Sequence, residues 1–181
     1  MNILKAVPVA LVVVGALLST GCQSARKALN LDTSAVIHFE AAELINPDSD
    51  GRASPVVIHV FKLADSRNFA RQDFLSLYEG ASARLGKDLL GSVELKEVTP
   101  GEKRTELIEL TPEVKYLGLM AEFIQYQNAV ALAEVVVLEH NENGYFVQIE
   151  GSEIKVIDAP EQQDDSPAMR HMKHLNRIST N

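Results

Sequence analysis

From Ala35 onward, apolar side chains recur at every second position, which is the period of a β-strand. Ile37 and Phe39, for example, alternate with His38 and Glu40. Short strands separated by turn residues at this spacing are typical of a β-sandwich. We therefore predict a mainly β fold, a two-sheet sandwich of about eight strands within residues 35–159. Further stretches with the same pattern lie at 56–63, 93–95, 107–109, 117–123, 130–138, 145–149 and 154–156.

One predicted strand, VVIHVFKL at residues 56–63, is apolar on both faces, so both faces must be covered. The segment NFARQDFLSLYEGASARLG at residues 68–86 has no β alternation. Asn68 suits a helix N-cap and Gly80 lies near a helix end. We expect one or two short helices in an insertion at 66–86, whose apolar side covers the second face of 56–63. The helical stripe would contain Phe69, Phe74, Leu77 and Tyr78.

Two dipeptides predict specific turns. Pro100-Gly101 suits a type II turn, because glycine accepts a positive φ at the third position. Asn143-Gly144 suits a tight hairpin between strands at 135–139 and 145–149.

The first 21 residues are typical of a secretory signal. Residues 6–18 form an uncharged run of 13, whereas a membrane-spanning helix needs roughly 20 apolar residues. Small residues follow at 19–21, and then comes Cys22, the only cysteine. This arrangement resembles a bacterial lipoprotein signal, although the leucine usually found three residues before the cysteine is here Ser19. An uncleaved membrane anchor remains the alternative.

The lipoprotein resemblance implies that Cys22 becomes the acylated first residue, and that residues 22–34 form the acylated cysteine and a polar tether. Gln23 after the cysteine implies sorting to the outer membrane. The chain has 17 basic and 25 acidic residues, a net charge of −8, which argues against nucleic acid and anionic lipid as partners. Attachment would rest on acyl chains such as palmitate.

After Pro160 the composition changes, and residues 160–181 are predicted to be a flexible tail. Its second half is basic, and apolar residues recur there at every third position. We consider two interpretations: a disordered segment, or a short basic helix that docks on a partner or on the acidic domain. The apolar positions are Met169, Met172, Leu175 and Ile178, and the basic ones are Arg170, Lys173 and Arg177.

Catalytic and metal-binding signals are weak. His38 and His59 lie on strands expected to be adjacent, and His171 and His174 have i, i+3 spacing, but neither pair has further ligands at a recognisable spacing. No nucleophile elbow, phosphate-binding loop or H-E-x-x-H motif occurs. We expect no enzyme activity, no cofactor, no metal and no small-molecule substrate.

The segment between the first two predicted strands is the candidate binding loop. Prolines bracket a run of turn-forming and charged residues, and ten residues is long for a strand connection. A calcium site from Asp48 and Asp50 is conceivable, but the EF-hand pattern is absent. The candidate partner-binding residues are Asn46, Pro47, Asp48, Ser49, Asp50, Gly51, Arg52, Ala53, Ser54 and Pro55.

Four stretches between residues 46 and 123 carry a family resemblance: GRASPVVIHVFKLADSRNF, DFLSLYEGASARLGKDLLG, TPGE and YLGLMAEF. In order and spacing they resemble the TssJ outer-membrane lipoproteins of type VI secretion systems. The chain departs from that pattern at Ala53, where family members often have a proline.

The resemblance implies a transthyretin-like sandwich with a helical addition. It also implies a non-enzymatic role: binding the periplasmic C-terminal domain of the inner-membrane protein TssM, partly through the loop at 46–55, and so tethering the trans-envelope complex to the outer membrane. The alternative is a ligand-binding or chaperone-like periplasmic lipoprotein with the same sandwich. A large apolar pocket between the sheets would favour the alternative, whereas a filled core with a protruding loop would favour the tether.

Overall fold

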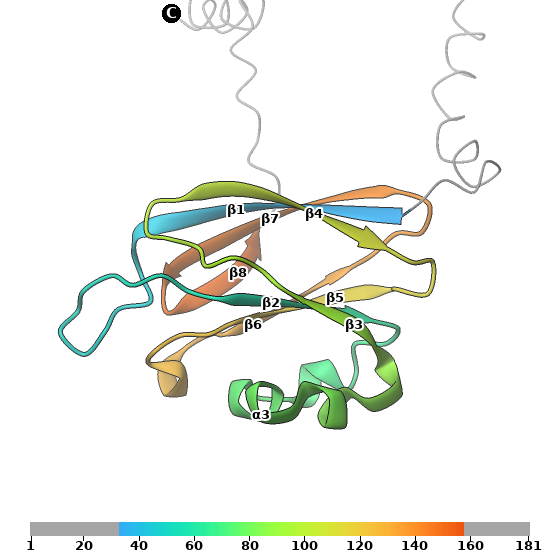
Figure 1. Ribbon diagram of the computed structural model, residues 1–181, viewed down its shortest axis with the longest axis horizontal. Helices are drawn as coiled ribbons and strands as arrows, with labels where there is room; N and C mark the ends of the chain where they lie inside the picture. Colours follow the sequence, from blue (N-terminus) through green and yellow to red (C-terminus); the bar gives the residue numbers. More distant parts are fainter. Residues whose placement is uncertain (1–32, 158–181) are drawn as a thin grey trace, which may run out of the picture.

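The alternating segments form eight strands in two sheets packed face to face (Figure 1). The computed structural model describes residues 33–157. The signal, Cys22, the predicted tether up to residue 32 and the tail lie outside the described residues. The strands are β1 (Thr33–Ile45), β2 (Ile58–Leu63), β3 (Leu89–Glu94), β4 (Lys103–Leu110), β5 (Tyr116–Ala121), β6 (Leu132–Val136), β7 (Glu142–Gly151) and β8 (Glu153–Ile157). Thr33 and Ser34, which we assigned to the tether, are the first two residues of β1.

Each sheet has four strands, and the predicted sandwich is confirmed. The first sheet has the order β4-β1-β7-β8 and the second the order β3-β2-β5-β6. Strands β1 and β7 run parallel, and the other paired strands run antiparallel. Because β1 and β2 belong to different sheets, the chain between them must cross from one layer to the other.

The interior between the sheets is filled by the apolar side chains that the alternation places on one face of each strand. Ile37 and Phe39 of β1 meet Ile58 and Val60 of β2 in one continuous cluster of buried residues. All four side chains are at most 2% exposed. Burial of this kind stabilises by about 25 cal/mol per Å² of apolar surface, so the core can hold this domain without a disulfide.

The insertion between β2 and β3 forms a helical layer over the outer face of the second sheet (Figure 1). Phe61 and Leu63 of β2 pack there against Phe69 and Leu77, as the two-faced strand predicted. Tyr78, also placed on the stripe, is instead 58% exposed. The layer consists of η2 (Phe69–Arg71), α3 (Phe74–Leu85) and η3 (Gly86–Asp88).

The helix boundaries differ from the prediction. Helix α3 is capped by Asp73, whose side chain accepts a hydrogen bond from the backbone N–H of Ser76 at 2.7 Å. Asn68 precedes η2 and makes no side-chain capping bond. Gly80 lies inside α3, where its φ of −174° and ψ of 58° interrupt the helical geometry, and α3 ends before Gly86. None of the described helices is long and apolar enough to cross a membrane.

One turn is confirmed and the other is wrong. Gly101 has φ 75°, and the N–H of Glu102 bonds the carbonyl of Thr99 at 3.1 Å, as a type II turn requires. Asn143 and Gly144 instead lie inside β7, and β6 and β7 belong to different sheets. The Asn143 side chain is buried and bonds the backbone of Ser34, Leu138 and Asn141, so tertiary contacts override the local hairpin preference.

Candidate partner-binding loop

The loop at 46–55 carries the chain from β1 in the first sheet to β2 in the second. It extends beyond the end of the sandwich as the teal loop at the left of Figure 1. The loop is held at its base, folded on itself at its tip, and exposed to solvent between residues 49 and 53.

Asn46 fixes the base. Its side chain is 2% exposed, and its amide nitrogen donates to the carbonyl of Pro55 at 2.6 Å, which closes the two ends of the loop. Its amide oxygen accepts from the N–H of Ile124 at 2.7 Å. Its backbone has φ 45°, a left-handed conformation that asparagine tolerates better than most residues. A buried amide with both ends paired holds one geometry.

A second contact supports the loop from the same side. The side-chain amide of Gln125 donates to the carbonyls of Pro47 and Asp48 at 3.1 and 3.0 Å. Residues 124 and 125 follow β5, so the loop is fixed to the second sheet as well as to the first. The exposed tip is therefore presented on a rigid base.

The tip is a compact turn built around Asp48. One carboxylate oxygen accepts from the N–H groups of Asp50 and Arg52, each at 2.9 Å. The N–H of Gly51 bonds the carbonyl of Asp48 at 3.0 Å, and Gly51 has φ 78°. An aspartate that bonds backbone two residues later is the usual Asx arrangement of a turn. The turn fixes which groups face outward.

The charges at the tip pair with each other. The Arg52 guanidinium forms ion pairs with Asp48 and with Asp50. The Arg52 and Asp50 side chains are 73% and 65% exposed, so this pair adds little stability. Exposed charges of this kind can orient an approaching partner, which affects specificity and association rate more than affinity.

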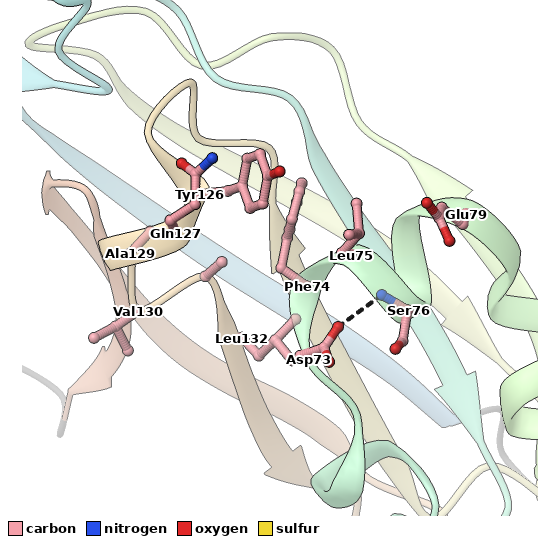
Figure 2. Close-up of a pocket in the computed structure, with 11 residues that line it drawn as sticks. Asp73, Phe74, Leu75, Ser76, Glu79, Tyr126, Gln127, Ala129, Val130 and Leu132 are labelled. Carbon is pink, nitrogen blue, oxygen red and sulfur yellow. Dashed lines mark hydrogen bonds between the residues drawn. The ribbon is translucent and has the colours of Figure 1, made fainter.

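An apolar groove lies between the start of α3 and the segment after β5 (Figure 2). The rings of Phe74 and Tyr126 stack there with centroids 5.2 Å apart. The groove has a volume of about 650 Å³ and lies outside the filled interior of the sandwich. Gln125 holds the loop and the next residue, Tyr126, lines the groove, so the turn η4 (Tyr126–Asn128) links the two features.

The histidines do not form a common site. His38 is on β1 and His59 on β2, in different sheets, so the expectation that they are neighbours is wrong. His38 stacks on Phe146 and bonds the Thr105 hydroxyl at 2.9 Å. His59 pairs with Glu122 at 2.5 Å. Within residues 33–157, no three histidine, cysteine or acidic side chains are placed to hold a metal ion.

The loop is recognisable in the sequence, but the contacts that support it are not. The bonds from Asn46 to Ile124 and from Gln125 to Pro47 each join residues 78 positions apart. No local pattern marks such pairs, because they arise from the way the two sheets stack. A polar asparagine at the end of an apolar strand was the only local signal.

The comparisons with known proteins give the family. Residues 33–152 match the model of the type VI secretion lipoprotein family, which includes VasD, EvfM and TssJ. No curated protein sequence matches the chain at a significant level.

Several solved structures share the fold. The type VI secretion lipoprotein TssJ1 from Pseudomonas aeruginosa is 26% identical, with a TM-score of 0.66 over 71% of this chain and 98% of that one. Serratia marcescens Lip, a membrane-bound component of the type VI secretion system, is 20% identical, with a TM-score of 0.65 over 72% of this chain and 100% of that one.

A chain in a structure described as the type VI secretion protein TssM C-terminal domain from EAEC is 17% identical. Its TM-score is 0.59 over 70% of this chain and 99% of that one. With the family model covering nearly the whole sandwich, this chain belongs to the type VI secretion lipoprotein family that includes TssJ.

Proposed function

We propose that this lipoprotein anchors the type VI secretion membrane complex to the outer membrane by binding the periplasmic C-terminal domain of TssM. The acyl chains on Cys22 would hold it in the membrane, facing the periplasm, and the loop at 46–55 would contact TssM. Its role is mechanical and not enzymatic. The family match and the rigid, protruding loop support the proposal.

The loop is the observation that carries the proposal. A binding segment that is already ordered loses little conformational entropy on association. Asn46 and Gln125 hold the base, and the Asp48 turn holds the tip. The interior between the sheets is filled by a continuous apolar cluster, which favours a tether over a carrier of small ligands.

The occurrence of the same fold in a structure described as the TssM C-terminal domain also supports the choice of partner. The groove of Phe74 and Tyr126 is connected to the loop through Gln125, which bonds Pro47 and Asp48 and directly precedes Tyr126, and it adds an apolar surface to the charged one of the loop. An interface that combines apolar anchors with a polar rim is common for protein partners.

The test uses a matched pair of charge reversals. Arg52→Glu places a carboxylate beside Asp50 at the loop tip, and Arg67→Glu does the same beside Asp65 at the other end of β2. Both arginines are mostly exposed and both pair with an aspartate two residues earlier. We expect Arg52→Glu to weaken binding to the TssM domain about tenfold or more, measured by calorimetry. Arg67→Glu should leave the dissociation constant unchanged.

Deletion of the loop tip is the second test of the proposed function. Removing residues 48–52 should abolish co-purification with TssM while the β-sheet circular dichroism stays as in the parent. If both the deletion and Arg52→Glu bind TssM like the parent, the assignment of the loop is wrong. If no form of the chain binds the TssM domain, the proposed partner is wrong.

A further inference from the structure

The outer face of the first sheet is not covered by any described element. The helical layer covers the second sheet only (Figure 1). Strand register defines what lies on this face: His38 of β1 is level with Thr105 of β4, Phe146 of β7 and, one strand further, Ile157 of β8. The next level contains Leu107, Val36 and Gly144.

Apart from Thr105, whose hydroxyl is hydrogen-bonded to His38, the residues of these two levels form a largely apolar band across the sheet. We call it the outer band: Val36, His38, Leu107, Gly144, Phe146 and Ile157. Leu107 is 63% exposed. A side chain added at Gly144 would meet no atom within 4 Å, so the space above this glycine is open. A hollow of about 300 Å³ adjoins the outer band and is lined by residues that include His38, Phe146 and Ile157.

Charge on the same face is mainly negative. The outward positions on either side of the outer band have five acidic and two basic side chains. Lys103 is already paired with Glu40 at 2.6 Å. A segment that covers the band should therefore combine apolar residues with positive charge. The acidic positions are Glu40, Glu109, Glu142, Glu150 and Glu153, and the basic ones are Lys103 and Lys155.

The chain has such a segment, and it begins beside this face. The described residues end at Ile157, which belongs to the outer band, and 24 residues follow. Residues 168–181 contain Arg170, Lys173 and Arg177 and no acidic residue. Met169, Met172, Leu175 and Ile178 recur at every third position. At about 3.6 residues per turn, this spacing would spread them over one half of a helix surface, with the three basic residues on the other half.

Length and local concentration favour this segment over a separate molecule. Eleven residues lie between Ile157 and Met169, and the twelve steps along the chain, at about 3.3 Å each, can span up to about 40 Å. The four strands of the sheet are together only about 15–20 Å wide, at about 4.8 Å between neighbours. Attachment through a segment of this length would give the tail an effective concentration on the order of mM at the sheet.

We propose that residues 169–178 dock as a short amphipathic helix on the outer band of the first sheet. The methionine and leucine side chains cover Leu107, Phe146 and the open space at Gly144. The arginine and lysine side chains lie toward the flanking glutamates. Docking gives the first sheet the kind of helical cover that the insertion gives the second.

The experiment measures amide hydrogen exchange by mass spectrometry on the full chain in detergent. Peptides covering residues 169–178 should exchange at least about tenfold more slowly than the same sequence as a free peptide. Leu107→Glu, which adds a negative charge at an exposed position on the β4 edge of the band, should remove the protection. Met172→Asp should do the same from the side of the tail.

The control is Val136→Glu on β6 of the second sheet. Val136 is 60% exposed, close to the value for Leu107, and this substitution should leave the protection unchanged. Circular dichroism of each variant checks that the sandwich is intact.

Three outcomes would overturn the proposal. Residues 169–178 could exchange as fast as the free peptide. Their protection could persist in Leu107→Glu, which would place them elsewhere. Protection could arise only at high protein concentration or only with the TssM domain present, which would make the occupant a second copy or the partner. None of these results depends on whether the loop at 46–55 binds TssM.

Discussion

The side-chain oxygen of Asn46, at the end of β1, accepts a hydrogen bond from the backbone N–H of Ile124, just after β5, at 2.7 Å. The two residues are 78 positions apart, and the bond joins a strand of the first sheet to the chain leaving a strand of the second. The same amide closes the loop through Pro55. One buried side chain thus couples the packing of the two sheets to the position of the candidate binding loop.

Asn46→Ala should destabilise the domain by about 2–4 kcal/mol, because it leaves the Ile124 N–H and the Pro55 carbonyl without this partner. Part of the loss comes from the left-handed backbone at φ 45°, which costs a non-glycine residue roughly 1–2 kcal/mol. Asn46→Gly loses the same bonds without that cost, so it should be the more stable of the two in urea unfolding. Equal stability of the two variants would show that backbone strain does not matter here.

Gly118→Ala should destabilise the domain by about 1–3 kcal/mol through overpacking. A Cβ at position 118 would lie 2.6 Å from the ring of Phe69, which packs over β5 from the helical layer. In the double variant with Phe69→Leu the two effects should be clearly less than additive in urea unfolding, because the smaller side chain leaves room.

Gly91→Ala is the matched control for Gly118→Ala. Both glycines lie in strands of the second sheet, but the atom nearest to a Cβ at 91 would be Cδ of the flexible Lys62 side chain at 3.9 Å, an ordinary contact distance. Its stability should stay within about 0.5 kcal/mol of the parent. A loss as large as that of Gly118→Ala would refute the steric explanation.

Asp65 should contribute to acid sensitivity. Hydrogen bonds from the side chain and backbone of Arg67 lower the pKa of Asp65 from 3.8 to about 2. Because the folded pKa is below the unfolded one, the stabilisation is fully present above about pH 4 and is lost as the pH falls toward 2. The gap in urea midpoint between the parent and Asp65→Asn should therefore shrink across that range. A constant gap from pH 6 to pH 2 would contradict the assignment.

Cys22→Ser should release the protein from the membrane, because several acyl chains are needed for stable anchoring. Flotation of cell membranes on a density gradient measures this, with Ser24→Ala as the control that keeps the cysteine. Association of Cys22→Ser with outer membrane at the level of the control would refute lipidation at this residue.

The sequence determined the elements whose signal is local. The period-two alternation predicted the strands, since one face of each must be buried. Because residues 56–63 are apolar on both faces, both faces had to be covered. The helical segment at 68–86, which lacks the strand alternation, covers the outer face. Pro100-Gly101 predicted its turn because glycine, unlike other residues, accepts a positive φ without steric cost, and Gly101 has this conformation. The prolines and aspartates of 46–55 likewise identified an exposed, structured loop.

Tertiary structure decided what depends on which strands meet. Asn143-Gly144 has the local preference for a hairpin, yet the Asn143 side chain is buried against Ser34 and Leu138, and the segment continues as a strand. His38 and His59, close in the predicted strand order, lie in different sheets. The support of the loop by Ile124 and Gln125 could not be predicted either. Contacts between residues 78 positions apart depend on how the two sheets stack. The local pattern of residue types does not specify which distant residues come into contact.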